Sequence, residues 1–150
     1  MSLLHPYCPG KKVFRPKNKD KFVGEYAPLR SGYEEKFAKW CDKTPAVIKW
    51  AYESIAISYY DPVKRKMRKY YPDFTLAVKN PNGTVNAYLV EVKPLKETKR
   101  PSRKPHQQQI IYQREVAGYA NNQAKWRAAQ AWCEKNNFEF KIIHENHLEI

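Results

Sequence analysis

A turn-rich segment between two strand-like stretches constrains this chain more than any other feature. Residues 71–79 and 85–93 are rich in β-branched and aromatic side chains, and residues 80–84 between them read Asn-Pro-Asn-Gly-Thr, a dense turn signal. We therefore predict a β-hairpin that is symmetric about the centre of this turn. In that register Asp73 lies directly opposite Glu91, at the end of the hairpin away from the turn.

The hairpin would bring two carboxylates and an amine onto one face of a sheet. Opposed residues have Cβ atoms about 4.5–5.5 Å apart, and Lys93, two residues beyond Glu91, points to the same face. Opposed carboxylates repel each other unless a divalent cation lies between them, and Mg²⁺ prefers carboxylate oxygens, waters and phosphate. We predict that Asp73 and Glu91 bind Mg²⁺ or Mn²⁺ beside Lys93, which suits phosphodiester hydrolysis. The pattern is short, and solvated acids with Lys93 paired to Glu91 are the alternative.

The charge balance favours a polyanionic partner. The chain has 28 Lys and Arg against 15 Asp and Glu among 150 residues, a formal net charge of +13, which points first to nucleic acid. Basic residues cluster at 11–21, 64–69 and 96–104, and the last two clusters flank the predicted metal site. We expect side chains from these two regions to contact the nucleic-acid backbone: Arg68, Lys69, Tyr70, Tyr71, Lys96, Lys99 and Arg100.

Other function classes find little support. No apolar run reaches the roughly 18 residues of a membrane span and no signal-peptide core is seen, so no membrane association is expected. Three cysteines without C-x-x-C spacing predict reduced thiols in a cytosolic protein. His144-x-x-His147 is a conceivable metal pair, but we expect surface histidines there and assign them no chemistry.

The order of the remaining elements predicts a mixed α/β domain. Residues 1–30 are basic and proline-rich, and we expect an irregular arm there, with the domain itself spanning 31–150. Hydrophobic periodicity predicts helices and strands outside the hairpin, with helices over 31–42, 106–120 and 122–135 and strands over 53–60 and 138–144. Together these predict a central mixed β-sheet, a three-strand antiparallel meander plus a C-terminal strand, flanked by helices.

The first predicted helix carries a third carboxylate of interest. At about 100° per residue, Glu34 lies on the rim of the apolar stripe, where it can look into a site between helix and sheet. A structural alternative is as strong, because Ser31-x-x-Glu34 is a capping box in which the Glu34 carboxylate accepts a hydrogen bond from the Ser31 N–H. The residues alone leave both interpretations open.

The order of these motifs resembles the restriction-endonuclease-like, or PD-(D/E)xK, nuclease superfamily: a helical glutamate, then Pro72-Asp73, then Glu91-Val92-Lys93. A closer resemblance is to the head-completion nucleases of contractile-tailed phages, which are related to TnsA-type endonucleases. It is carried by residues 30–37, 70–74, 91–94, 125–133 and 140–143. The resemblance implies a restriction-endonuclease-like core in which Glu34, Asp73 and Glu91 bind the metal and Lys93 is the catalytic lysine.

The resemblance also implies a setting. Head-completion proteins act after DNA packaging, so we expect a Mg²⁺-dependent endonuclease that acts on packaged DNA at the head neck. Its partners would be DNA and head or portal-neck proteins, in the cytoplasm of the infected bacterial host, with virion association and oligomeric state left open. Two alternatives stand beside this: a non-catalytic DNA-binding neck or plug protein that retains the fold, and a junction or repair nuclease of the same superfamily.

Overall fold

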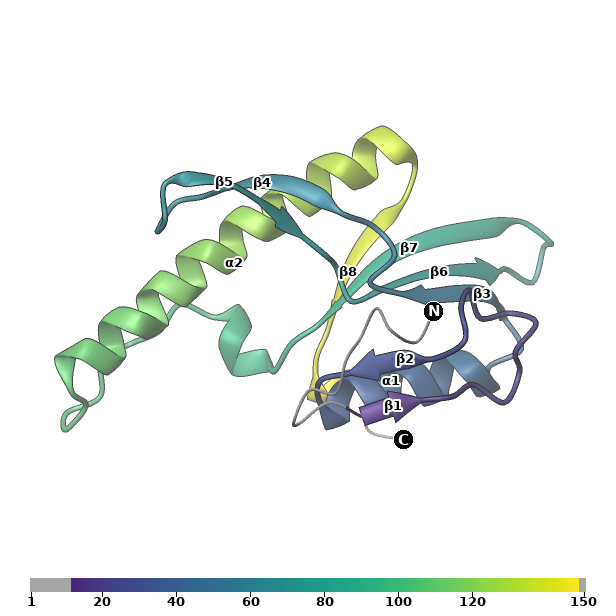
Figure 1. The fold of residues 1–150 in the computed structure, drawn as a ribbon, viewed down its shortest axis with the longest axis horizontal. Coiled ribbons are helices and arrows are strands. Elements are labelled where there is room, and N and C mark those ends of the chain that lie inside the picture. The colour runs from purple at the N-terminus through teal and green to yellow at the C-terminus, as the bar shows by residue number, and fades with distance from the viewer. Residues whose placement is uncertain (1–11, 149–150) are drawn as a thin grey trace.

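The computed structural model of this chain describes residues 12–148, which form a mixed α/β fold (Figure 1). The elements follow one another as β1 (Lys12–Phe14), β2 (Ala27–Leu29), α1 (Gly32–Lys43), β3 (Val47–Tyr52), β4 (Ile57–Asp61), β5 (Lys66–Tyr70), β6 (Phe74–Lys79), β7 (Val85–Val92), the 3-10 helix η2 (Leu95–Thr98), α2 (Gln109–Asn136), β8 (Glu139–Ile143) and the 3-10 helix η3 (Glu145–His147).

The central sheet has the strand order β3-β6-β7-β8. β6 and β7 pair antiparallel with Thr75 opposite Leu89 and Lys79 opposite Val85, so the predicted hairpin register is confirmed. β7 pairs parallel with β8, which makes the sheet mixed. The predicted fold class, a meander plus a C-terminal strand flanked by helices, is therefore confirmed.

The third strand of the meander is not the predicted one. β3, Val47–Tyr52, pairs with β6, whereas the predicted strand at 53–60 corresponds to β4, which pairs with β5 in a separate hairpin. β3 was not predicted because its register shifts between Val47 and Lys49, which breaks the alternation of buried and exposed residues. β5 was not predicted because four of its five residues are exposed and three of these are basic, so no alternation of apolar residues marks it.

α2 is one helix and not the predicted pair. It continues through residues 120–122 because its second half is held by tertiary contacts: Trp126, Ala129 and Cys133 are buried with side chains of β4 and β7. Such packing overrides weak local propensity. The helix ends at Asn136 and is capped by Asn137, which has a left-handed φ of 65°. No helix among residues 12–148 has the length and apolarity needed to cross a membrane.

The region before residue 31 differs from the irregular arm that we expected. β1 and β2 pair antiparallel, and Phe22 and Leu29 are buried in the same core cluster as Phe74. The Asp42 carboxylate accepts hydrogen bonds from the backbone N–H groups of Lys17 and Asn18, both at 3.0 Å. Residues 12–30 therefore pack onto the domain, while the part of the predicted arm at residues 1–11 lies outside the described residues.

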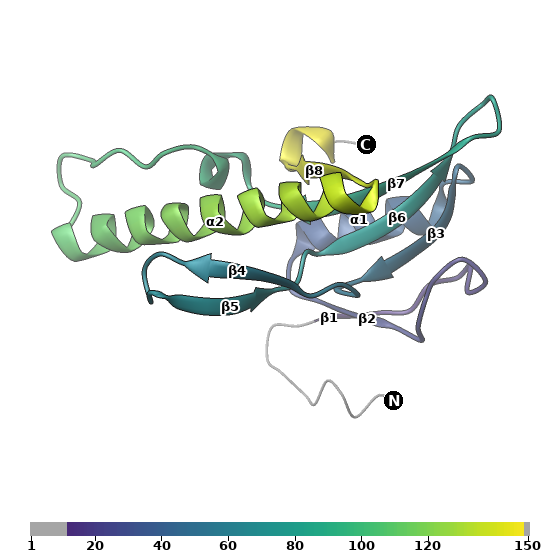
Figure 2. The same ribbon diagram turned by 90° about the horizontal axis from the view of Figure 1, so that it is seen from above.

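The sheet separates two cores. Adjacent residues of β7 point to opposite faces, so that Val90 joins the cluster beneath α1 while Leu89 joins the cluster formed with β4 and α2. The β4–β5 hairpin lies along α2, and together they project from the sheet (Figure 2). The strand ends that carry Asp73 and Glu91 lie where these two halves of the molecule meet.

Candidate active site

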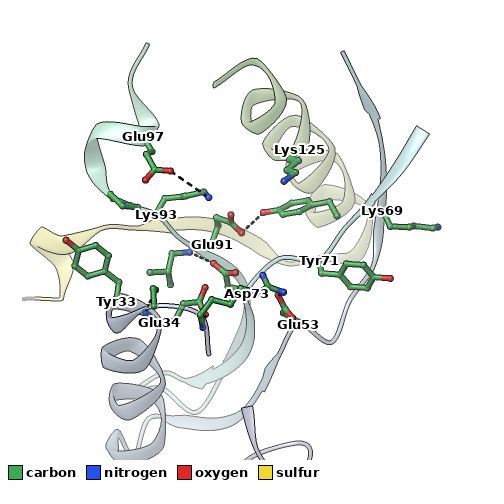
Figure 3. Close-up of a pocket in the computed structure, with 15 residues that line it drawn as sticks. Tyr33, Glu34, Glu53, Lys69, Tyr71, Asp73, Glu91, Lys93, Glu97 and Lys125 are labelled. Carbon is green, nitrogen blue, oxygen red and sulfur yellow. Dashed lines mark hydrogen bonds and ion pairs between the residues drawn. The ribbon is translucent and has the colours of Figure 1, made fainter. Parts of the chain in front are cut away.

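Three buried carboxylates line one cavity of about 540 Å³ (Figure 3). Glu34 comes from the first turn of α1, Asp73 from the residue before β6, and Glu91 from the penultimate position of β7. Each of the three is 6% exposed. The fold thus brings together the three acids that the sequence singled out, although α1 and the hairpin are distant in the chain.

Asp73 is held at the open end of the β6–β7 hairpin. Its Oδ2 accepts a hydrogen bond from the Val92 N–H at 2.8 Å, which ties it to the strand that carries Glu91. Burial raises the pKa of Asp73 well above its ordinary value, and the charges of Glu91 and Glu34 raise it further. Burial also raises the pKa of Glu91. A bound cation would offset the repulsion that the charges of Glu91 and Glu34 exert on an ionised Asp73.

Two tyrosines orient two of the carboxylates. The Tyr70 hydroxyl donates to Glu91 Oε1 at 2.7 Å, and the Tyr52 hydroxyl donates to Glu34 Oε1 at 2.9 Å. Burial, followed by the adjacent glutamate, raises the pKa of each phenol, so both act as neutral donors. Tyr70 was expected at the DNA backbone, but it is 4% exposed because it lies opposite buried Ile57 in the β4–β5 hairpin.

The two interpretations of Glu34 turn out to be compatible. Ser31 Oγ accepts from the Glu34 N–H at 3.1 Å, so Ser31 caps α1 as predicted. The Glu34 carboxylate, however, accepts from the Arg30 N–H at 2.9 Å and not from Ser31, one residue earlier than in the expected capping box. Glu34 therefore secures the entry into α1 while its carboxylate lines the cavity.

Lys93 also lines the cavity, but it is not paired with Glu91. Its Nζ lies 4.0 Å from Glu97 Oε1 on η2, and the Lys93 side chain is 29% exposed. Its backbone N–H donates to the Ile143 carbonyl at 2.9 Å, which anchors this point of the chain to β8. A long ion pair between partly solvated groups contributes little stability, so Lys93 can exchange this partner for a phosphate.

The predicted nucleic-acid contacts fall into two places. Lys69 and Tyr71 line the carboxylate cavity, whereas Lys96, Lys99 and Arg100 line a neighbouring cavity of about 530 Å³ between residues 96–104 and α2. Arg68 makes an ion pair of 3.1 Å with the buried Asp61, so part of its role is to hold the β4–β5 hairpin together.

Three residues that line the cavity, Arg30, Glu53 and Lys125, were not assigned a role in its chemistry from the sequence. Arg30 Nη2 lies 2.6 Å from Glu53 Oε2, and the Glu53 N–H donates to the Asp73 carbonyl at 2.8 Å from a left-handed backbone with φ 49°. Lys125 enters the cavity from α2. Arg30 and Lys125 lay in stretches that carried the family resemblance, without an assigned role. No local pattern marks Glu53, because only folding brings it to Arg30 and Asp73.

The donor set suits a hard cation such as Mg²⁺. Residues 12–148 contain no ready cluster of three or more Asp, Glu, His or Cys side chains spaced to hold a metal. One oxygen of each acid already accepts a hydrogen bond: Glu34 Oε1 from Tyr52 and Arg30, Glu91 Oε1 from Tyr70, and Asp73 Oδ2 from Val92. Each acid therefore keeps a second oxygen for a cation, and the pair of Asp73 and Glu91 at the end of the hairpin offers two. Mg²⁺ is commonly held by one or two carboxylates, with waters and substrate phosphate completing its shell, so this pair fits it.

The raised pKa values predict that the metal-free protein loses stability as the pH rises. Asp73 and Glu91 hold protons more tightly in the folded state, so between about pH 4, where free carboxyls titrate, and their raised values the folded state binds more protons. For each such proton, the free energy of unfolding falls by up to about 1.4 kcal/mol for every unit by which the pH rises. Urea unfolding in EDTA across this window measures the effect. Asp73→Asn should flatten the profile, and an unchanged slope in that variant would contradict the prediction.

Comparison of the sequence with known proteins gives two matches. A family model of the TnsA-like endonuclease N-terminal domain matches residues 44–145, which include Asp73, Glu91 and Lys93 but not Glu34. The head completion nuclease of Enterobacteria phage T4 is 33% identical over 138 residues, which cover 89% of each chain. These matches confirm the resemblance identified from the motifs, and the chain belongs to the TnsA-like endonuclease family.

Proposed function

We propose that this protein is a metal-dependent endonuclease that hydrolyses phosphodiester bonds of double-stranded DNA during phage head completion. The observation that carries the proposal is the buried, hydrogen-bonded pair of Asp73 and Glu91 in one cavity with Lys93. Family membership supports nuclease activity, and the similarity to the T4 head completion nuclease supports the setting. The protein would then act in the infected host, on DNA at the head neck and beside portal-neck proteins.

The side chains that line the cavity have different roles in the proposed hydrolysis. Asp73 and Glu91 would hold Mg²⁺ or Mn²⁺, and the bound ion supplies Lewis acidity and a lowered pKa of water. Lys93 donates to a phosphate oxygen and offsets the charge that develops there. Tyr70 keeps Glu91 in position through its 2.7 Å hydrogen bond, and Glu34, held by Tyr52, lines the wall facing the pair.

Cations on either side of the cavity would bind the DNA backbone. Lys69 lies at the cavity itself beside the neutral Tyr71, whose hydroxyl can donate to a phosphate, and Lys96, Lys99 and Arg100 lie in the adjacent cavity. Contacts of this kind position DNA without reading its sequence. The net charge of +13 is consistent with binding that is governed by phosphates.

DNA binding is expected to weaken steeply with salt. About five phosphate contacts by cations, namely Lys69, Lys93, Lys96, Lys99 and Arg100, give a slope near −4.5 for log Kobs against log[salt], or a loss of roughly 500-fold between about 50 and about 200 mM salt. Fluorescence anisotropy of a labelled duplex in EDTA measures this slope. Replacing both Lys96 and Arg100 with Gln should reduce its magnitude by about 2, whereas the exposed Lys79→Gln, at the turn end of β6, should leave it unchanged. A nearly flat dependence would contradict the electrostatic interface.

The test of the function is cleavage of supercoiled plasmid with Mg²⁺, with Mn²⁺ and with EDTA. We expect metal-dependent nicking or linearisation that disappears in Asp73→Asn and in Lys93→Met. DNA binding without cutting, unchanged in both variants, would instead support the non-catalytic neck or plug protein. Running the reaction on plain duplex and on branched DNA separates the head-completion role from junction resolution, since a resolving enzyme would cut the branch selectively.

A further inference from the structure

A second lysine reaches the carboxylate cavity from a different element. Lys125 lies in the middle of α2, whereas Lys93 follows β7, and both line the same cavity. Figure 3 shows the two side chains approaching Glu91 from separate directions, Lys125 from the helix and Lys93 from the segment after the strand. A phosphate bound at the carboxylates would therefore lie within a site that presents two cations.

The position of Lys125 is set by aromatic rings. Its Nζ lies 5.6 Å from the Tyr70 ring centroid and 5.9 Å from that of Tyr59, within the range of cation–π attraction. Both rings are themselves fixed, because the Tyr70 hydroxyl bonds Glu91 and the Tyr59 hydroxyl bonds Asn121 Oδ1 at 3.1 Å. Asn121 lies one helical turn before Lys125, so the same hairpin that orients Glu91 also orients this amine.

The surroundings of Lys125 leave N–H donors of its ammonium group available to a ligand. Among residues 12–148, its amine has no carboxylate within ion-pairing distance of 4.0 Å, unlike Lys93, which has Glu97. Ring contacts do not satisfy its three N–H donors. Burial lowers the pKa of Lys125, and the charge of Glu91 acts in the opposite direction. A partly desolvated cation that lines the cavity proposed to hold the scissile phosphate is well suited to contact a phosphate oxygen.

We propose that Lys125 is a second catalytic lysine, whose ammonium group contacts a non-bridging oxygen of the scissile phosphate from the α2 side while Lys93 does so from the β7 side. This role rests on the nuclease function proposed above. In hydrolysis a water oxygen forms a new bond to phosphorus, one P–O ester bond breaks, and the leaving oxygen gains the proton that the water loses. Lys125 stays protonated throughout and offsets the negative charge that gathers on the phosphoryl oxygens.

The test compares Lys125→Met and Lys125→Arg with a matched control on the same helix. Lys135→Met removes an exposed lysine from the last turn of α2, away from the cavity. Single-turnover cleavage of duplex DNA at saturating protein should be about 100-fold slower in Lys125→Met, with a DNA Kd in EDTA within about threefold of the wild type, because only one of several phosphate contacts is lost. Lys125→Arg should recover part of the rate, and Lys135→Met should match the wild type.

The outcomes distinguish a catalytic role of Lys125 from a structural one. If Lys125 merely ties α2 to the hairpin, Lys125→Met will unfold at a lower temperature but cut at the wild-type rate well below that temperature, which overturns the proposal. A wild-type rate in Lys125→Met without loss of stability overturns it as well. If the wild-type protein cuts no DNA with any metal, the proposed function itself fails and this role falls with it.

Discussion

Replacing Asp73 with asparagine is expected to abolish DNA cleavage and to stabilise the metal-free protein. The introduced amide keeps an oxygen that can accept from the Val92 N–H, the contact that Asp73 makes at 2.8 Å. The substitution removes the negative charge that a metal needs, and metal catalysis contributes several kcal/mol, so the rate should fall at least about 10³-fold. It also removes the repulsion from Glu91 and Glu34 that raises the pKa of Asp73, so the folded state gains stability at neutral pH.

Plasmid cleavage and urea unfolding in EDTA measure the two effects on the same preparations. Asp20→Asn is the matched control, because Asp20 is an exposed carboxylate that does not line the cavity. That control should retain wild-type activity and stability. An Asp73→Asn protein that keeps more than about a tenth of the wild-type rate, or that unfolds more readily at neutral pH, would show that Asp73 is not a buried metal ligand.

Lys93→Met is expected to slow cleavage by about 10²–10³-fold with little change in DNA affinity. Lys93 lines the cavity beside the carboxylates, and removing one well-placed donor to a developing oxyanion typically has an effect of this size. Its long contact with Glu97 joins side chains that are 29% and 45% exposed, so losing this pair should hardly alter the free energy of unfolding. Methionine preserves the length and apolar stem of the side chain.

Single-turnover rates, DNA affinity in EDTA and metal binding together distinguish this variant from Asp73→Asn. Lys93→Met should still bind Mn²⁺, which titration calorimetry detects, whereas Asp73→Asn should bind it much more weakly. Lys79→Met, at the opposite end of β6, serves as the exposed-lysine control. If Lys93→Met lost metal binding and DNA binding together, its role would be structural and not catalytic.

The proximity of Asp73 to Glu91 was predictable from local sequence patterns, namely the turn and the two strands beside it. A short turn between the two strands sets their register, because the side-chain period of a strand is 2 and a slip of one residue would exchange Leu89 and Val90 between the two cores. The confirmed pairs of β6 with β7 continue to the end of the hairpin where the two acids lie. The helix of Glu34 was also predictable, because Ser31 caps it through a local hydrogen bond.

Other features of the site depend on contacts between distant parts of the chain, which no local pattern encodes. β3 takes the sheet edge because Val47 and Trp50 are buried against α1 and β2, and α2 remains one helix because Trp126 is buried against the β4–β5 hairpin. The partners of the carboxylates arise in the same way: Tyr52 reaches Glu34 across 18 residues and Tyr70 reaches Glu91 across 21. Spacing along the chain thus specified that Asp73 meets Glu91, whereas long-range packing brought Glu34 to them and specified what surrounds the three acids, because burial and hydrogen bonding depend on neighbours that only the folded chain supplies.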